Sequence, residues 1–243
     1  MTYNEENAHE RDGKLQFDPE SHTYFLNGKK LKSVTTLVEE CFPQFDAVYW
    51  ANRKAPQEGV TPGELMERWE REAQRARDLG TIMHDKIERY YLGEDSGDDT
   101  DAYRLFRSFA AVNRLHPYRT EWRIYFEEYG IAGTLDFLER TPQGTYNIYD
   151  WKRSRKLVNR YGQVEMTSPF RKTALHPVSH LPDCSYYHYA LQISVYRYIL
   201  EQKYGININR MRLGVFHPSY TGYYVVDIPY LRDEVIRILE QMN

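Results

Sequence analysis

Three short segments near the middle of the chain constrain its fold most strongly. Residues 122–127, 131–138 and 146–151 are rich in aromatic and β-branched side chains, which favour extended backbone. Turn-forming residues separate them, such as those at 142–144. This pattern predicts three consecutive antiparallel strands.

The segments on either side of these strands complete the predicted architecture. Helical patterns fill most of residues 33–115, and two more strand patterns near the C-terminus alternate with helical patterns. The sequence therefore predicts an α+β (α/β) fold in which helices flank a mixed central sheet. Within one domain, 1–243, the expected parts are a tail at 1–12, a hairpin at 14–32, a helical part at 33–115 and a mixed-sheet core at 120–243.

Two local signals refine this N-terminal half. The dipeptide Asn27-Gly28 favours a tight hairpin turn. Thr61, followed by Pro62 and Glu64, is typical of a helix start. We expect that helix to end near residue 76 and Gly80 to separate it from a second helix that ends near residue 91.

Composition limits the location of the protein and its cofactors. The sequence has no run of about 18 apolar residues and no apolar segment at its N-terminus, so we expect no membrane contact and a cytoplasmic location. Only two cysteines are present, Cys41 and Cys184. Two cannot hold a four-cysteine cluster, so we expect buried thiols and no iron–sulfur cluster.

The charge distribution indicates a positive zone although the net charge is −3. Residues 152–172 contain seven basic side chains and one acidic side chain, Glu165. Residues 94–101 are acidic and predict a solvated loop. We expect the basic segment, and Arg153, Arg155 and Lys156 in particular, to contact the phosphate backbone of DNA.

The tripeptide Asp150-Trp151-Lys152 ends one predicted strand. Side chains alternate faces along a strand, so Asp150 and Lys152 should point the same way, with Cα atoms roughly 6.5 Å apart. A carboxylate at this position can bind a hard cation. The ammonium group can activate water or neutralise charge that develops on a phosphate. The pattern therefore predicts a reaction centre at this strand end.

The preceding strand carries a second acid, Asp136, which a short turn can bring beside Asp150. Two adjacent carboxylates repel each other unless a cation lies between them. Gly133 and Thr134 are expected to leave room for a phosphate, and the Trp151 carbonyl could be a further metal ligand.

Two helix faces supply further candidates. His84 and Glu88 share one face, and Gln192 and Tyr196 share another, because each pair is four residues apart. An imidazole ligand would favour Mn²⁺ over Mg²⁺. Gln192 could orient water or phosphate, and Tyr196 could stack on a base. The alternative is that each pair simply packs in a helix interface.

Taken in order, these residues resemble the motifs of the PD-(D/E)XK nuclease superfamily. The similarity is to its RecB-like branch, which includes the mitochondrial genome maintenance exonucleases and viral and prophage-borne members. The matching residues are Gly80, Thr81, His84, Glu88, Gly133, Thr134, Leu135, Asp136, Asp150, Trp151, Lys152, Gln192 and Tyr196. Asp150 stands where Glu is commoner, and an N-terminal stretch, 24–36, also resembles viral members.

The resemblance implies a restriction-endonuclease-like core and a metal-dependent DNA exonuclease. It implies Mg²⁺ or Mn²⁺ held by His84, Asp136, Asp150 and the Trp151 carbonyl, with Lys152 as the catalytic lysine. It also implies that Gln192 and Tyr196 line the path of single-stranded DNA or DNA ends. Glu88, Glu121 and Thr134 are expected to support this site.

Three alternatives stay open at this stage. A nuclease-like protein that binds DNA in recombination without cleaving it would share the motifs. A hydrolase of small phosphate esters would share the chemistry. A zinc site could use His176, His180, Cys184 and His188, which recur every four residues, although Pro177 and Pro182 argue against one continuous helix.

Overall fold

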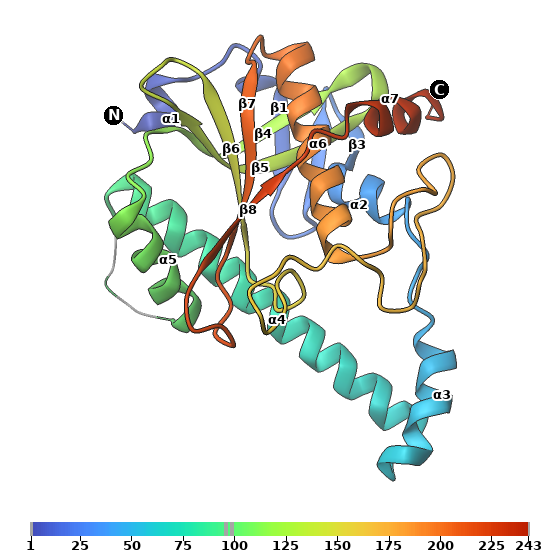
Figure 1. Cartoon of the computed structure of the whole chain (residues 1–243). Coiled ribbons are helices and arrows are strands. Elements are labelled where there is room, and N and C mark those ends of the chain that lie inside the picture. Colours follow the sequence, from blue (N-terminus) through green and yellow to red (C-terminus); the bar gives the residue numbers. More distant parts are fainter. Residues whose placement is uncertain (1, 95–96, 98–99, 243) are drawn as a thin grey trace.

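The structure is a computed structural model that describes residues 2–94, 97 and 100–242 (Figure 1). The helices are α1 (Tyr3–Glu6), α2 (Val34–Glu39), α3 (Ala47–Glu58), α4 (Pro62–Leu92), α5 (Asp101–Val112), α6 (Ser185–Lys203) and α7 (Arg232–Glu240). The strands are β1 (Leu15–Asp18), β2 (Thr23–Leu26), β3 (Lys29–Ser33), β4 (Pro117–Phe126), β5 (Ile131–Arg140), β6 (Tyr146–Lys152), β7 (Ile208–Val215) and β8 (Tyr224–Ile228). The predicted fold class is confirmed: one mixed sheet has helices on both faces.

The arrangement around β5 creates a break in the sheet. The strand order is β1-β2-β3-β5-β6-β7-β8, and β4 pairs with the other edge of β5. On the edge opposite β4, β6 pairs antiparallel with residues 137–140, while β3 pairs parallel with Ile131 and Ala132. Residues 133–136 lie between these two pairings. This part of the edge is where Asp136 stands.

Two apolar clusters hold the helices to the sheet. The larger one joins α2, α6 and α7 to one face and includes Trp122 and Leu191. The second joins α5 and the end of α4 to the other face, around Phe106 and Trp151. Short loops precede and follow most elements, but residues 153–184 form the long connection that the sequence predicts. No helix within the described ranges has the length and apolarity needed to cross a membrane.

The helix α4 differs from its prediction. It runs without interruption through Gly80, where the sequence predicts a boundary between two helices. Its buried residues are Leu65 near one end and Met83 and Ile87 near the other. The residues between them are partly or fully exposed, and α3 packs against the first turns. We call α3 and the first half of α4, residues 45–77, the arm, because they project from the body (Figure 1).

The N-terminal segment also differs from its prediction. Residues 2–12, expected as a tail, form α1 and a turn that lie against β4. The side chain of Asn4 bonds to the backbone of Thr120, and Asp12 accepts hydrogen bonds from Arg119 and from the Trp122 indole. The expected hairpin at 14–32 is a three-stranded meander, whose last strand joins the main sheet. The turn at Asn27-Gly28 is confirmed, with positive φ at both residues.

We expect Asp12→Ala to destabilise the protein clearly. The Asp12 carboxylate lies 2.7 Å from the Arg119 guanidinium and 2.8 Å from the Trp122 indole nitrogen. Its removal leaves a buried cation and a buried donor unpaired, which should cost about 2 kcal/mol of unfolding free energy. Urea denaturation measures this change. Glu20→Ala, at an exposed carboxylate, is the control, and an equal loss in both variants would contradict the assignment.

Candidate metal centre

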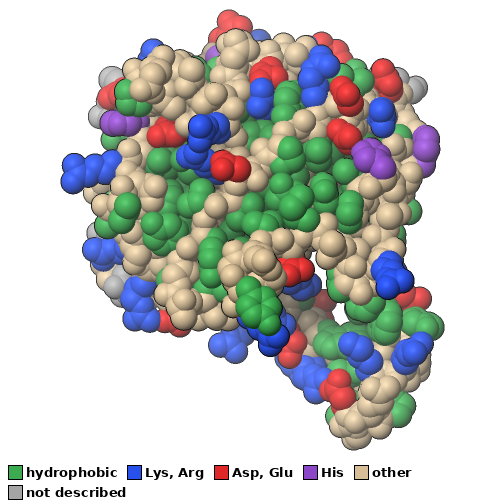
Figure 2. Space-filling model, in the orientation of Figure 1, with side chains coloured by type: hydrophobic (Ala, Val, Ile, Leu, Met, Phe, Trp, Pro, Cys, Tyr) green, Lys and Arg blue, Asp and Glu red, His purple; other side chains and the backbone are tan. Residues whose placement is uncertain are grey.

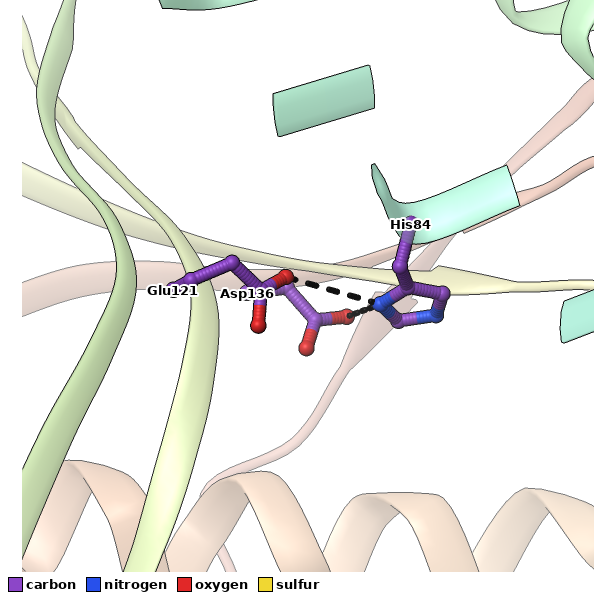
Figure 3. Close-up of side chains that lie close together, drawn as sticks. All are labelled: His84, Glu121 and Asp136. Atoms are coloured by element: carbon purple, nitrogen blue, oxygen red, sulfur yellow. Dashed lines mark ion pairs between the residues drawn. The ribbon is translucent and has the colours of Figure 1, made fainter. Parts of the chain in front are cut away.

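One histidine and two carboxylates from three elements converge beside the break in the sheet. His84 comes from α4, Glu121 from β4 and Asp136 from β5 (Figure 3). His84 Nδ1 lies 3.5 Å from Asp136 Oδ2 and 3.7 Å from Glu121 Oε1. Their potential ligand atoms all lie within 4.8 Å of one another, and among the described residues they are the set that could hold a metal ion.

The open edge of β5 positions Asp136. Beyond Tyr149, β6 leaves its ladder with β5. There the Trp151 N–H donates to Asp136 Oδ2 at 2.7 Å in place of a backbone carbonyl. The carboxylate therefore satisfies a buried donor and is fixed in orientation. Asp136 is only 8% exposed, so its position is defined by the protein and not by solvent.

Glu121 reaches the site through an unusual backbone. Its φ of +44° lies in the left-handed region, which non-glycine residues seldom adopt and which often marks functional sites. On either side of it, Thr120 pairs with Phe137 and Trp122 pairs with Leu135. Glu121 therefore stands opposite Asp136. The sequence predicts only a supporting role for Glu121, because no local pattern reveals this conformation.

Asp150 and Lys152 point the same way, as predicted. Lys152 Nζ lies 2.6 Å from Asp150 Oδ2 and 4.8 Å from the centre of the Tyr189 ring of α6. The Trp151 ring, on the opposite face, packs in the cluster under α4 and α5. Asp150 is turned toward Lys152 and stands outside the His84–Glu121–Asp136 group. The role of Asp150 as a metal ligand stays a prediction.

The Trp151 carbonyl orients His84. It lies 2.8 Å from His84 Nε2, and a carbonyl can only accept, so Nε2 carries a proton. The neutral imidazole then has its lone pair on Nδ1, the atom that faces the two carboxylates. In the structure the carbonyl supports the histidine through this hydrogen bond. Its role as a direct metal ligand stays a prediction.

Burial and crowding of charges shift several pKa values. Burial, reinforced by the Asp136 carboxylate, raises the pKa of Asp150 to about 6. Burial also raises the pKa of Asp136, and the neighbouring His84 only partly opposes this. Burial alone would lower the pKa of Lys152, but Asp150 and Asp136 more than compensate and raise it. A cation beside these carboxylates would favour their ionised forms and oppose the effect of burial.

These residues fit a hard or borderline divalent cation. Two carboxylates and one imidazole suit Mn²⁺, and the carboxylates also suit Mg²⁺. Asp150 can turn from Lys152 only by breaking the ion pair. Asp136 and Glu121 place two carboxylates beside one histidine, which gives a physical reason for a cation here.

Proton release from His84 should make stability and metal binding depend on pH. Burial lowers the pKa of His84, but Asp136 and Glu121 raise it from 6.5 to about 9. The folded state thus holds this proton more tightly, so its stabilising effect is complete below pH 6.5 and is lost as pH rises toward 9. We expect the melting temperature of metal-free protein to fall over this interval, and Mn²⁺ affinity to rise. Calorimetry at several pH values measures both.

The control for this pH dependence is His84→Gln. The substitution removes the titrating group, so the melting temperature should no longer fall between pH 6.5 and 9. An unchanged slope would show that another group titrates.

The predicted substrate residues of α6 have a structural role. The Tyr196 ring is 3% exposed, so it cannot stack on a base in this structure. It occupies the space beside Gly133, where a Cβ would lie 2.6 Å from the ring. The room expected at Gly133 for a phosphate is therefore filled. Gln192 donates to the Tyr196 hydroxyl at 3.1 Å and faces Thr35.

The two remaining support residues lie at the margin of the centre. Thr134 bonds through its hydroxyl to Tyr24 at 2.8 Å, which joins the N-terminal meander to β5. Glu88 is half-buried, and burial together with Glu121 raises its pKa. It lies near the metal group but is not part of it.

A basic cleft opens beside Lys152. It has a volume of about 570 Å³, and its lining residues include Trp69, Arg153, Arg155, Lys156, Tyr189 and His217. Burial and the nearby Arg153 and Arg155 lower the pKa of His217. Glu72 is the acidic residue on its wall. Figure 2 shows Lys and Arg side chains around the hollow between the body and the arm. Arg153, Arg155 and Lys156 thus line one cleft, and their contact with DNA stays a prediction.

The zinc alternative finds no common site. His180 pairs with Glu234, and His188 pairs with Asp183, each at 2.9 Å. His176 bonds to Gln241. Cys41 and Cys184 are free thiols. Of the predicted acidic loop, residues 95, 96, 98 and 99 lie outside the described residues.

Comparison with known proteins leaves the family open. No family model and no curated protein matches this sequence. The crystal structure of SSO0001 is similar over 87% of this chain and 74% of that chain, with 16% identity and a TM-score of 0.35. A similarity at this level supports no inference about fold or function.

Proposed function

We propose that this protein is a metal-dependent deoxyribonuclease that hydrolyses phosphodiester bonds, in the manner of the RecB-like PD-(D/E)XK nucleases that its motifs resemble. One observation carries the proposal. The buried Asp150–Lys152 pair lies on the strand next to Asp136, between a candidate cation site and a basic cleft. The two acids, the lysine and a basic surface that can bind phosphates thus lie in one continuous region.

Each residue has a distinct role in this proposal. His84, Glu121 and Asp136 would hold Mg²⁺ or Mn²⁺, which supplies Lewis-acid activation of water and of the phosphoryl group. Asp150 holds Lys152 at 2.6 Å, so that the ammonium charge faces the substrate in a fixed position. There it can neutralise charge that develops on the phosphate in the transition state.

The cleft favours a nucleic acid over a small phosphate ester. Its cations Arg153, Arg155 and Lys156 form no ion pair with the residues that the structure describes, so they are available for several successive phosphates. Exonuclease action on single strands or DNA ends in recombination, repair or replication, within the cytoplasm, belongs to the same proposal. An accessory role in DNA binding is the alternative, since Asp150 stands apart from the metal group.

The test is hydrolysis of end-labelled DNA by purified protein. Linear single strands should be degraded with Mn²⁺ or Mg²⁺ and remain intact with EDTA. Circular single strands should resist if ends are required. DNA binding without metal-dependent products would reject the nuclease and favour the accessory role, and hydrolysis only of small esters would reject a DNA substrate.

A further inference from the structure

Exposed aromatic side chains gather at the base of the arm, where α3 begins next to the body. Phe45 and Phe170 are each 65% exposed, and Tyr49 is 52% exposed. Trp50 of α3 lies 5.6 Å from Phe170, between ring centres, although Phe170 belongs to the loop after β6. We call Phe45, Tyr49, Trp50 and Phe170 the arm-base platform. Hydrophobic side chains cover this part of the arm in Figure 2.

Cations surround these rings. Lys54 Nζ lies 5.8 Å from the centre of the Trp50 ring, and Arg53 bonds to the Tyr49 hydroxyl. Arg171 and Lys172 follow Phe170 directly and are exposed. Lys54, Arg171 and Lys172 form no ion pair within the described part of the chain. A purely apolar partner would leave these charges desolvated, whereas a polyanion with flat rings would satisfy both features.

The platform is continuous with the basic cleft. Trp69 of α4 lines the cleft, and its ring centre lies 5.8 Å from that of Phe45. Trp69 precedes His84 by 15 residues of one unbroken helix, which corresponds to about 22 Å. A strand that starts at the metal centre would cover that distance with about six nucleotides at the stacked spacing of about 3.4 Å.

We propose that the arm-base platform stacks the bases of a single-stranded nucleic acid whose phosphates lie in the basic cleft. The inference rests on the proposed nuclease function and extends it, because it assigns the bases of the unpaired strand to a binding surface outside the metal centre. Bases in a duplex are already stacked on each other, so a duplex cannot use the platform. The rings therefore add affinity only for single strands long enough to reach the arm.

The test is fluorescence anisotropy in EDTA, which separates binding from cleavage. The probes are labelled oligothymidylates of 4 to 16 nucleotides and a duplex of 16 base pairs. Trp50→Ala and Phe170→Ala should each bind the longest strand about tenfold more weakly than wild type. The 4-mer and the duplex should bind all three proteins equally. Tyr3→Ala, an exposed ring on α1 at the far side of the body, is the matched control and should match wild type.

Two results would overturn the platform. One is unchanged affinity of both variants for the longest strand, which would leave the rings to another partner. The other is an equal loss for single strand and duplex, which would indicate that the rings only hold the loop in place. Either result can occur while the wild type still cleaves DNA. Conversely, ring-dependent binding without cleavage would refute the nuclease proposal and leave the platform intact.

Discussion

Lys152→Met should lower kcat for cleavage of single-stranded DNA about 10²–10³-fold and change KM little. Methionine keeps much of the aliphatic length of the side chain, but it removes the ammonium charge that lies 2.6 Å from Asp150 and 4.8 Å from the centre of the Tyr189 ring. We place that charge opposite the phosphate in the transition state, so its loss should affect the chemical step and not ground-state binding. Steady-state kinetics on one labelled oligonucleotide measures both constants.

Lys156→Met is the matched control for this prediction. Lys156 is an exposed cation of the same cleft, beyond the reaction centre. Its loss should raise KM and reduce the salt dependence of binding by one phosphate contact, with kcat nearly unchanged. Equal effects of the two substitutions on kcat would mean that Lys152 is only another phosphate contact. Circular dichroism of each variant confirms that the fold is retained.

Glu121→Gln should weaken Mn²⁺ binding about 10–100-fold and lower activity at limiting metal by a similar factor. The substitution keeps the shape of the side chain but removes one of the two carboxylates that face His84 Nδ1. Excess Mn²⁺ should restore part of the activity, because the other ligands remain. Isothermal titration calorimetry measures the affinity directly.

Glu88→Gln provides the comparison on the neighbouring acid. Glu88 is half-buried near Glu121 but stands outside the metal group. The Glu88→Gln substitution should therefore change Mn²⁺ affinity only slightly. If Glu88→Gln proved more damaging than Glu121→Gln, the cation would lie closer to α4 than the geometry around β5 indicates.

The parts of the site that the sequence predicts depend on local geometry. Strand alternation alone puts Asp150 and Lys152 on one side and Trp151 on the other. A single short turn brings β5 and β6 together, which is why the sequence also indicates Asp136. The fold class follows in the same way from periodic segments. The bounds of β5 and β6 are close to those predicted, whereas β4 begins five residues before its predicted start.

The parts that the sequence does not predict depend on distant partners. Glu121 enters the metal group through a positive φ that nothing in its neighbours indicates. The polar composition of residues 2–12 is typical of a disordered tail. What orders this segment is the contact of Asp12 with Arg119 and Trp122, which lie more than 100 residues later in the sequence. Gly80 is a residue type that favours a helix break, but α4 continues through it without interruption.

Tyr196 is a residue whose exposure also depends on a distant partner. Its helical spacing with Gln192 is equally consistent with a substrate-facing pair and a packed interface. The packed interface forms because β5 has a glycine, Gly133, at the point of contact. The Tyr196 ring fills the space that a larger side chain at this position would need. Sequence spacing defines a shared face, but the neighbouring element determines whether that face is open.

The position of Mn²⁺ in crystals of the protein, located by anomalous scattering, tests the central claim most directly. The account predicts a peak at coordinating distance from His84 Nδ1 and from the carboxylates of Glu121 and Asp136, with Lys152 beside it. A protein that degrades DNA with Mn²⁺ but binds the ion elsewhere, for example at His180 and Glu234, would contradict the account.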